Sequence, residues 1–222
     1  MKRLPRSSKY RETRGYENCQ KRIYDGVGEY NIPALEPVTY LPNVESWISF
    51  NKTRTVRRMD NKGIHFFIDD YQFERLWDQP DSYIDMLSHY AAVCTPDFSP
   101  YSDFPKAIQL YNHYRKHWLG AYWQEHGIVV IPTITWSSPD TLEWAFDGEP
   151  VGGIVALSSV GMFDTAEHKA WLLDGYEMML DLLMPTTVLW KGKVPDELKD
   201  DWRIAVMPSI LDDLHKLPRK RG

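Results

Sequence analysis

Beyond about residue 60 the chain repeats one pattern: a short apolar run, a turn rich in Pro, Gly, Asp or Ser, and then helical periodicity. The apolar runs are rich in β-branched and aromatic residues, which is typical of strands. Five of them predict strands over residues 63–69, 91–95, 127–135, 153–158 and 187–190. Further strands are expected near 37–40 and 203–206, so the sheet should hold about six to seven strands.

Helical periodicity predicts four helices between these strands. They cover residues 71–90 with a break at Pro80, 105–126, 139–146 and 166–183. Asp164 is expected to cap the last helix, with Glu167 at the third helical position, and Pro185 to end it. Strands that alternate with helices in this way favour a parallel sheet with helical crossovers.

The predicted fold class is therefore α/β. No glycine-rich phosphate loop follows any strand, which removes the main sequence reason for a dinucleotide-binding or P-loop fold. Polar residues end nearly every strand, which favours an incomplete (β/α) TIM-like barrel, because a full eight-fold barrel takes about 250 residues. An open doubly wound sheet is the alternative. We expect a basic N-terminal arm over 1–45, an α/β core domain over 46–195 and a C-terminal helical extension over 196–222.

Charge is unevenly distributed along the chain. Residues 1–62 hold 13 Lys or Arg against 7 Asp or Glu, and residues 63–222 hold 13 against 24, which together give the net charge of -5. The basic part contains the segment KTRTVRR and several tyrosines, a composition that could contact phosphates. The residues expected to do so are Lys52, Arg54, Arg57 and Arg58. A solvated, partly disordered arm is the alternative interpretation.

Composition also bears on the compartment. Cys19 and Cys94 are too few and too far apart in sequence to indicate a disulfide framework or a zinc site. The first ten residues are basic with no apolar run behind them, so we expect no secretory signal. No stretch approaches the roughly 18 apolar residues of a membrane span. We therefore expect a cytoplasmic protein that does not enter a membrane, and no motif indicates a cofactor.

Ligands of parallel α/β proteins bind at the carboxyl ends of the strands. The residues found there are carboxylates, hydroxyls, aromatic rings and a lysine, which suit a polar, flat or ring-shaped ligand. The candidate ligand-binding residues are Ser99, Tyr101, Arg115, Thr135, Trp136, Ser158, Trp190 and Lys191. Trp136 and Trp190 each end a predicted strand, where a ring could stack on a sugar or a nucleobase.

Two aspartates are the candidate catalytic pair. Alternation along residues 63–70 places Asp69 on the inner face of the sheet and leaves Asp70 to cap the following helix. The alternative is that Asp69 is itself the cap, with Gln72 as its partner. Asp97 lies in the segment CTPDFSPYSDFP, where Ser102 or Asp103 already serves as a helix cap. Asp97 is thus left without a structural task, although a purely local turn role is the alternative.

The helix at 105–126 carries one unusual charge and one false lead. Arg115 projects into its apolar face, where an unpaired guanidinium is costly, so we expect a partner: Asp69, Asp97 or an anionic ligand group. Snorkelling to the helix edge is the alternative. His113 and His117 are four residues apart, the spacing at which two histidines reach one metal. Because periodicity places both opposite the apolar face, we expect solvent-facing histidines and no metal site.

Three segments carry a resemblance to a known family. They are HFFIDDYQFERLWDQP (65–80), TPDFSPYSDFPKAIQLYNHYRKHWLGAYWQEHGIVVIPTITW (95–136) and GGIVALSSVG (152–161). In these segments the chain resembles an uncharacterised family of bacterial, plasmid and phage proteins, domain of unknown function 4417. The likeness covers about residues 45 to 192. It implies an accessory role in a phage or plasmid, and it assigns no functional residues.

Two hypotheses of different class follow from these residues. The first is an enzyme acting on a sugar or nucleotide-like small molecule, with hydrolysis or transfer at a glycosidic or N-glycosidic bond, since that is the chemistry two carboxylates most readily support. The second is a nucleic-acid-binding accessory protein that uses the basic N-terminal segment. A protein that inhibits or sequesters a host component is a third class, which leaves no mark in a sequence.

Overall fold

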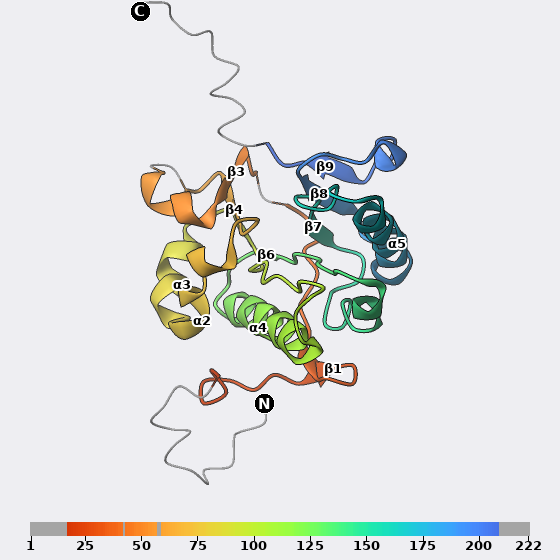
Figure 1. Ribbon diagram of the computed structural model, residues 1–222. Coiled ribbons are helices and arrows are strands. Elements are labelled where there is room, and N and C mark those ends of the chain that lie inside the picture. The colour runs from red at the N-terminus through yellow and green to blue at the C-terminus, as the bar shows by residue number, and fades with distance from the viewer. Residues whose placement is uncertain (1–16, 42, 57–58, 209–222) are drawn as a thin grey trace, which may run out of the picture.

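The computed structural model describes residues 17–41, 43–56 and 59–208, which form a mixed α/β structure with parallel sheets (Figure 1). One parallel sheet contains four strands in the order β3 (Ser46–Ser49), β4 (Lys62–His65), β5 (Ala92–Cys94) and β6 (Val130–Ile131). The other contains β7 (Ile154–Ser158), β8 (Thr187–Lys191) and β9 (Ile204–Val206). A short antiparallel pair, β1 (Gly26–Val27) and β2 (Ile32–Pro33), precedes them.

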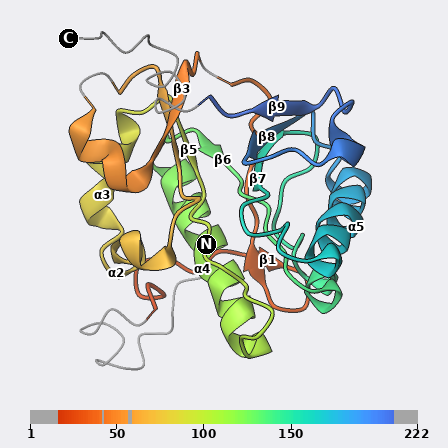
Figure 2. The ribbon, with the colours of Figure 1, turned by 45° about the horizontal axis from the view of Figure 1, so that its top comes forward.

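The helices connect successive strands. The α-helices are α2 (Arg75–Asp78), α3 (Asp81–Ser88), α4 (Lys106–Glu125) and α5 (Ala166–Leu183), and the 3-10 helices are η1 (Phe50–Thr55), η2 (Asp70–Gln72), η3 (Pro139–Glu143) and η4 (Asp196–Leu198). Helices α2 and α3 lie beside the four-stranded sheet, and α5 lies outside the three-stranded sheet (Figure 1). Helix α4 runs between the two groups (Figure 2).

The two parallel sheets are joined at two places by backbone contacts. Beyond β6, Thr133 forms an isolated parallel bridge with Ala156, where the Ala156 amide donates to Pro132 O at 2.7 Å and the Ile134 amide to Ala156 O at 2.8 Å. After β9, Pro208 O accepts a 3.0 Å hydrogen bond from the amide of Trp47 in β3. The prediction of a parallel α/β arrangement is confirmed. The parallel strands of the described residues form two sheets, however, and neither one sheet of six or seven strands nor a closed barrel.

The helices follow the predicted periodicity more closely than the strands do. Helix α5 has the expected bounds, although Thr165 and not Asp164 caps it, its hydroxyl accepting from the His168 amide at 3.0 Å. The break at Pro80 separates α2 from α3. The run at 127–135 supplies only the two residues of β6, and residues 37–40 are not a strand. The first strand of the sheet is instead β3.

Apolar side chains form two cores, one on each face of the three-stranded sheet. Val155 and Leu157 of β7 pack with Leu172 and Tyr176 of α5. The alternate residues, Ile154 and Ala156, belong instead to the larger core that includes the four-stranded sheet and α4. One face of the three-stranded sheet therefore shares a core with the four-stranded sheet and α4. Helix α5 covers the opposite face of the three-stranded sheet.

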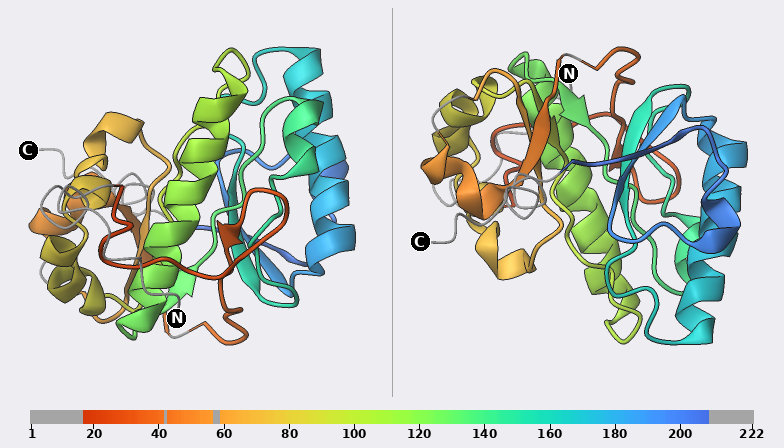
Figure 3. Two further views of the ribbon diagram at one scale, coloured as in Figure 1. Left: turned by 90° about the horizontal axis from the view of Figure 1, so that it is seen from below. Right: turned by 90° about the horizontal axis from the view of Figure 1, so that it is seen from above.

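The N-terminal segment packs on α4 instead of extending away as an arm (Figure 3). Ile32 and Leu35 are buried, with exposed fractions of 1% and 5%. The Asn18 side-chain amide donates to Trp77 O at 2.8 Å, and the Leu35 amide donates to Gly148 O at 2.9 Å. Residues 17–41 therefore pack against the rest of the described structure. Residues 1–16 lie outside the described part, and the division of the chain at residue 45 stays a prediction.

The C-terminal part of the described chain is not purely helical. The segment expected to be a helical extension, 196–222, holds the 3-10 helix η4 and the strand β9 up to residue 208. Its remaining residues, 209–222, lie outside the described part. Among the described residues, no helix is long and apolar enough to cross a membrane.

Candidate functional site

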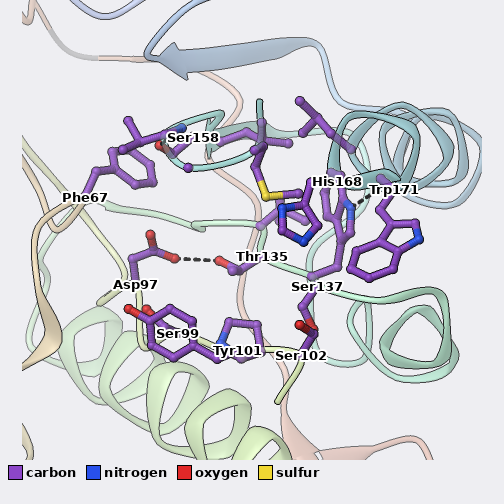
Figure 4. A pocket seen from close by; sticks show the side chains of 18 of the residues that line it. Phe67, Asp97, Ser99, Tyr101, Ser102, Thr135, Ser137, Ser158, His168 and Trp171 are labelled. Atoms are coloured by element: carbon purple, nitrogen blue, oxygen red, sulfur yellow. Dashed lines mark hydrogen bonds between the residues drawn. The ribbon is translucent and has the colours of Figure 1, made fainter. Parts of the chain in front are cut away.

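A cavity of about 350 Å³ opens at the carboxyl ends of the strands, between the two parallel sheets (Figure 4). Its walls are formed by the segments that follow β4, β5, β6 and β7 and by the first turns of α5. The lining residues combine carboxyl and hydroxyl groups with apolar and aromatic surface. Those with polar side chains are Asp69, Asp97, Ser99, Tyr101, Ser102, Thr135, Trp136, Ser137, Ser158, His168 and Trp171.

Asp97 is the carboxyl group of the cavity with the most perturbed environment. It follows β5 and accepts a 2.7 Å hydrogen bond from the Thr135 hydroxyl, which comes from the segment after β6 (Figure 4). Burial raises the pKa of Asp97 from 3.8 to about 6; the Thr135 hydrogen bond and the charge of Lys116 oppose this shift, and the charge of Asp70 adds to it. A carboxyl group with this pKa can hold or release a proton near neutral pH.

Asp69 and Asp70 have different surroundings. Asp69 lines the cavity as predicted, whereas Asp70 does not cap a helix. Asp69 is exposed and lines the cavity, and the Gln72 amide nitrogen donates to Asp69 Oδ2 at 3.3 Å. Asp70 was expected to cap the next helix. Its carboxylate instead accepts from the Ser99 amide at 3.0 Å and from the Ser99 hydroxyl at 2.9 Å. These two hydrogen bonds hold the turn that contains Asp97 and Ser99 against the segment that follows β4.

Five of the eight candidate ligand-binding residues line the cavity: Ser99, Tyr101, Thr135, Trp136 and Ser158. Tyr101 is half exposed at the rim. Trp136 is mostly buried, with an exposed fraction of 6%, and its indole NH donates to Trp171 O at 2.9 Å. Trp136 therefore exposes little of its ring to the cavity, too little for a ligand to stack on a whole face.

The other three candidates do not line the cavity. Arg115 is buried and pairs with Glu74, and its guanidinium carbon lies 3.6 Å from the ring centre of Phe98. We had expected Asp69, Asp97 or an anionic ligand group as its partner. The partner is instead Glu74. Trp190 is fully buried against α5, and its indole NH donates to the Ser159 hydroxyl at 3.2 Å, so its ring cannot stack on a ligand.

Lys191 is the half-buried last residue of β8 and does not line the cavity. Burial, together with the positive charge of Lys191, lowers the pKa of His65 in β4 to about 3. The charge of a residue at the end of β8 thus reaches the inner face of β4. Strand β4 ends at His65, so Asp69 lies beyond the strand whose alternation was used to place it.

Sequence reasoning missed four polar lining residues, Ser102, Ser137, His168 and Trp171, and the last two belong to helix α5. Both line the cavity from the N-terminal turns of α5, with ring centres 5.2 Å apart. The prediction considered only the residues that directly follow each strand. Because α5 begins next to the end of β7, its first two turns also face the cavity, and inspection of those turns would have identified both residues.

The prediction that His113 and His117 face solvent is wrong. Both are buried, with exposed fractions of 4% and 0%. Periodicity assumes that a surface helix has one solvent-facing side, whereas α4 is covered on one side by the four-stranded sheet and on the other by β2 and the segment around Gly148. The polar face of α4 is buried because another segment of the chain covers it and supplies backbone carbonyls to its histidines.

The candidate nucleic-acid-binding residues are only partly described. Lys52 and Arg54 are exposed in η1, remote from the lining of the cavity. Arg57 and Arg58 lie outside the described residues. A phosphate-binding role for these four residues therefore stays a prediction.

The fold and the cavity define a parallel α/β protein with a solvent-accessible site at its strand ends. The match to the model for the domain of unknown function DUF4417 extends over residues 24–210, and the chain belongs to this family. That match is wider than the region of about 45 to 192 on which the resemblance was based. It includes the N-terminal segment that packs on α4 and the strand β9.

Two phage proteins are similar to the chain, and both carry the description "Gene 1 protein". The protein of Mycobacterium phage L5 is 37% identical over 174 residues, which cover 78% of this chain and 76% of the relative. The protein of Mycobacterium phage D29 is 39% identical over 175 residues, which cover 78% of this chain and 64% of the relative. No solved structure gives a significant match to the chain.

Proposed function

We propose that this phage-family protein binds a small polar, ring-containing molecule in the strand-end cavity and hydrolyses or transfers a glycosidic or N-glycosidic bond. The observation that carries the proposal is the position of Asp97, a carboxyl group with a pKa of about 6 that faces a cavity of about 350 Å³. General acids in hydrolases are carboxyl groups whose pKa is raised in this way by burial.

The two aspartates are suited to different roles. Asp97 would donate its proton to the leaving oxygen or nitrogen while the bond from that atom to the sugar carbon breaks. Asp69, exposed at the mouth, would either attack the sugar carbon or take a proton from the attacking water. The first route forms a covalent glycosyl intermediate and retains configuration, and the second inverts it.

The remaining lining residues suit a ligand with both polar and apolar faces. Hydroxyl groups of Ser99, Ser137 and Ser158 can exchange hydrogen bonds with ligand hydroxyls. Trp171 and Tyr101 are the lining aromatic residues with the more accessible rings. A nucleoside or a glycoside with a flat aglycone would satisfy both kinds of surface.

An incomplete barrel would explain why these segments meet. We infer that β3 to β9 form one curved parallel wall in chain order. The Thr133–Ala156 bridge supports continuity between β6 and β7, and the hydrogen bond from Trp47 N to Pro208 O links the two ends of the wall. In such an arrangement every strand directs its carboxyl end to a common mouth, where barrel enzymes place their active sites.

A hydrolysis assay on nucleosides and aryl glycosides tests the proposal. Removing an acid or base group lowers the rate by roughly 10² to 10⁴. We expect this loss for Asp97→Asn and for Asp69→Asn. Asp103→Asn is the matched control, because Asp103 is exposed and does not line the cavity.

The pH dependence of the rate provides a second criterion. If Asp97 acts as the acid, kcat should fall as the pH rises through about 6. Turnover that is indifferent to Asp97→Asn, or no turnover and no binding of any nucleoside or glycoside, would rule the proposal out.

A further inference from the structure

A second group of chemically active side chains lies inside the protein, on the far side of Thr135 from the main cavity. His113 and His117 of α4 and Glu149 of the segment after η3 offer ligand atoms that all lie within 4.8 Å of one another. The side chains of His117 and Glu149 have no exposed area, and His113 is 4% exposed. Three groups of this kind are rarely buried together without a common partner.

The hydrogen bonds of the two imidazoles fix which nitrogen of each ring is free. His113 Nε2 lies 2.9 Å from Asp147 O, and His117 Nδ1 lies 3.0 Å from Pro33 O. A carbonyl oxygen can only accept, so each of these nitrogens carries the proton. The other nitrogens, His113 Nδ1 and His117 Nε2, then hold the lone pairs. Backbone carbonyls orient metal-binding histidines in this same way.

Glu149 completes the group and leaves one oxygen without a partner. Its Oε1 accepts from Lys116 Nζ at 2.7 Å and lies 3.0 Å from His117 Nε2. A lone pair on Nε2 that faces a carboxylate oxygen is repelled unless a proton or a metal ion lies between them. Glu149 Oε2 is buried and has no hydrogen-bond partner among the described residues. An unpartnered buried carboxylate oxygen is costly, and a cation would relieve that cost.

Lys116 and a small void lie next to the group. Lys116 is the one ammonium in contact with Glu149 among the described residues, whereas Asp97 and Asp147 are near enough to interact electrostatically with Lys116 and His117. A void of about 10 Å³, about the minimum that holds one water molecule, lies beside His113 and Lys116 and shares Thr135 with the main cavity; His117 and Glu149 do not line it.

We propose that His113, His117 and Glu149 bind one divalent transition-metal ion of the zinc class. Two imidazoles and a carboxylate are a donor set that zinc, cobalt and nickel accept, whereas calcium and magnesium prefer oxygen ligands alone. Lys116 would hold the carboxylate through Oε1 and leave Oε2 for the ion. The site would tie β2, through Pro33, and the segment 147–149 onto α4. This inference is independent of the proposed function.

Metal content of the full-length protein is the direct test. After growth in zinc-supplemented medium, we expect about one metal ion per chain by mass spectrometry of the elements. Binding of Co²⁺ to the chelator-treated protein should produce the visible absorption of a four-coordinate ion. Zinc at a hundredfold excess over its dissociation constant should raise Tm by about 5 to 10 °C.

Variants distinguish this site from histidines on the surface. Glu149→Gln and His113→Asn should each abolish stoichiometric metal and the Co²⁺ absorption. His89→Asn is the control, because His89 is exposed at the end of α3, and its metal content should match that of the unaltered protein. Should the Glu149 and His113 variants fail to fold, the measurements on the unaltered protein decide the question.

The opposing result is equally specific. A protein that retains less than about a tenth of an equivalent of any metal, whose Tm is the same with zinc and with chelator, and which gives no Co²⁺ absorption would overturn the proposal. The group would then be a buried, hydrogen-bonded ion pair in which a proton occupies the contact between His117 and Glu149.

Discussion

Replacement of Asp97 by Asn should stabilise the protein at alkaline pH and leave its stability unchanged near pH 4. Burial raises the pKa of Asp97 from 3.8 to about 6, so the folded state holds this proton more tightly than the unfolded state does. The contribution of Asp97 to the free energy of unfolding should therefore fall as the pH rises from about 4 to about 6 and then stay constant. Asparagine carries no charge and can still accept the hydrogen bond from Thr135.

The magnitude follows from the size of the shift. A shift of about 2 pKa units corresponds to about 3 kcal/mol of lost stability above pH 6. The variant should recover up to about that amount at pH 8 and none of it at pH 4. Urea unfolding of both proteins at pH 4, 6 and 8 measures the difference, and Asp103→Asn serves as the control because Asp103 is exposed.

Two results would refute this reasoning. One is a difference between Asp97→Asn and the unaltered protein that is the same at pH 4 and at pH 8. The other is a carbon NMR titration in which the Asp97 carboxyl group ionises near pH 4. Either would mean that the group is well solvated in the folded state, and the argument for an acid at this position would be lost.

Three further predictions follow from individual contacts. Gly148→Ala should destabilise the fold by more than about 1 kcal/mol in urea unfolding, because Gly148 has φ +79 and a Cβ there would lie 2.6 Å from Pro33 O. Unchanged stability would contradict that packing. Trp190→Phe should lower the free energy of unfolding by about 2 kcal/mol without affecting ligand affinity, since the ring is fully buried. Weakened ligand binding at unchanged stability would mean that Trp190 contacts the ligand. If the basic segment binds phosphates, heparin should retain the protein at low salt and retain a Lys52→Ala, Arg54→Ala double variant less; no retention at all would end that hypothesis.

The elements with strong local signals could be predicted from the sequence. Helix α5 has an uninterrupted apolar periodicity and a proline beyond its end, and its observed bounds agree with the predicted ones. The segment around β6 was predicted too long, because an apolar run does not reveal where backbone pairing stops. Strand β3 was missed because Trp47 and Ile48 form a short run between polar residues, and its pairing with β4 is a contact that no local pattern reports.

The site was predictable as far as parallel strand topology determines it. Asp69, Asp97 and Thr135 all line one cavity, as the rule on carboxyl ends of strands implies. Which side chain pairs with which was not predictable, since those choices depend on tertiary packing. Arg115 pairs with Glu74, and Asp70 binds Ser99. The buried histidines were missed for the same reason: the segment that covers them is distant in sequence from α4.

A crystal soaked with a panel of nucleosides and aryl glycosides tests the central claim most directly. The account predicts ligand density between the two sheets, with a polar atom of the ligand in hydrogen-bond contact with the Asp97 carboxyl group and a ring against Trp171 or Tyr101. Density at any other place, or a strand-end cavity that stays empty at millimolar concentrations of every compound, would contradict it.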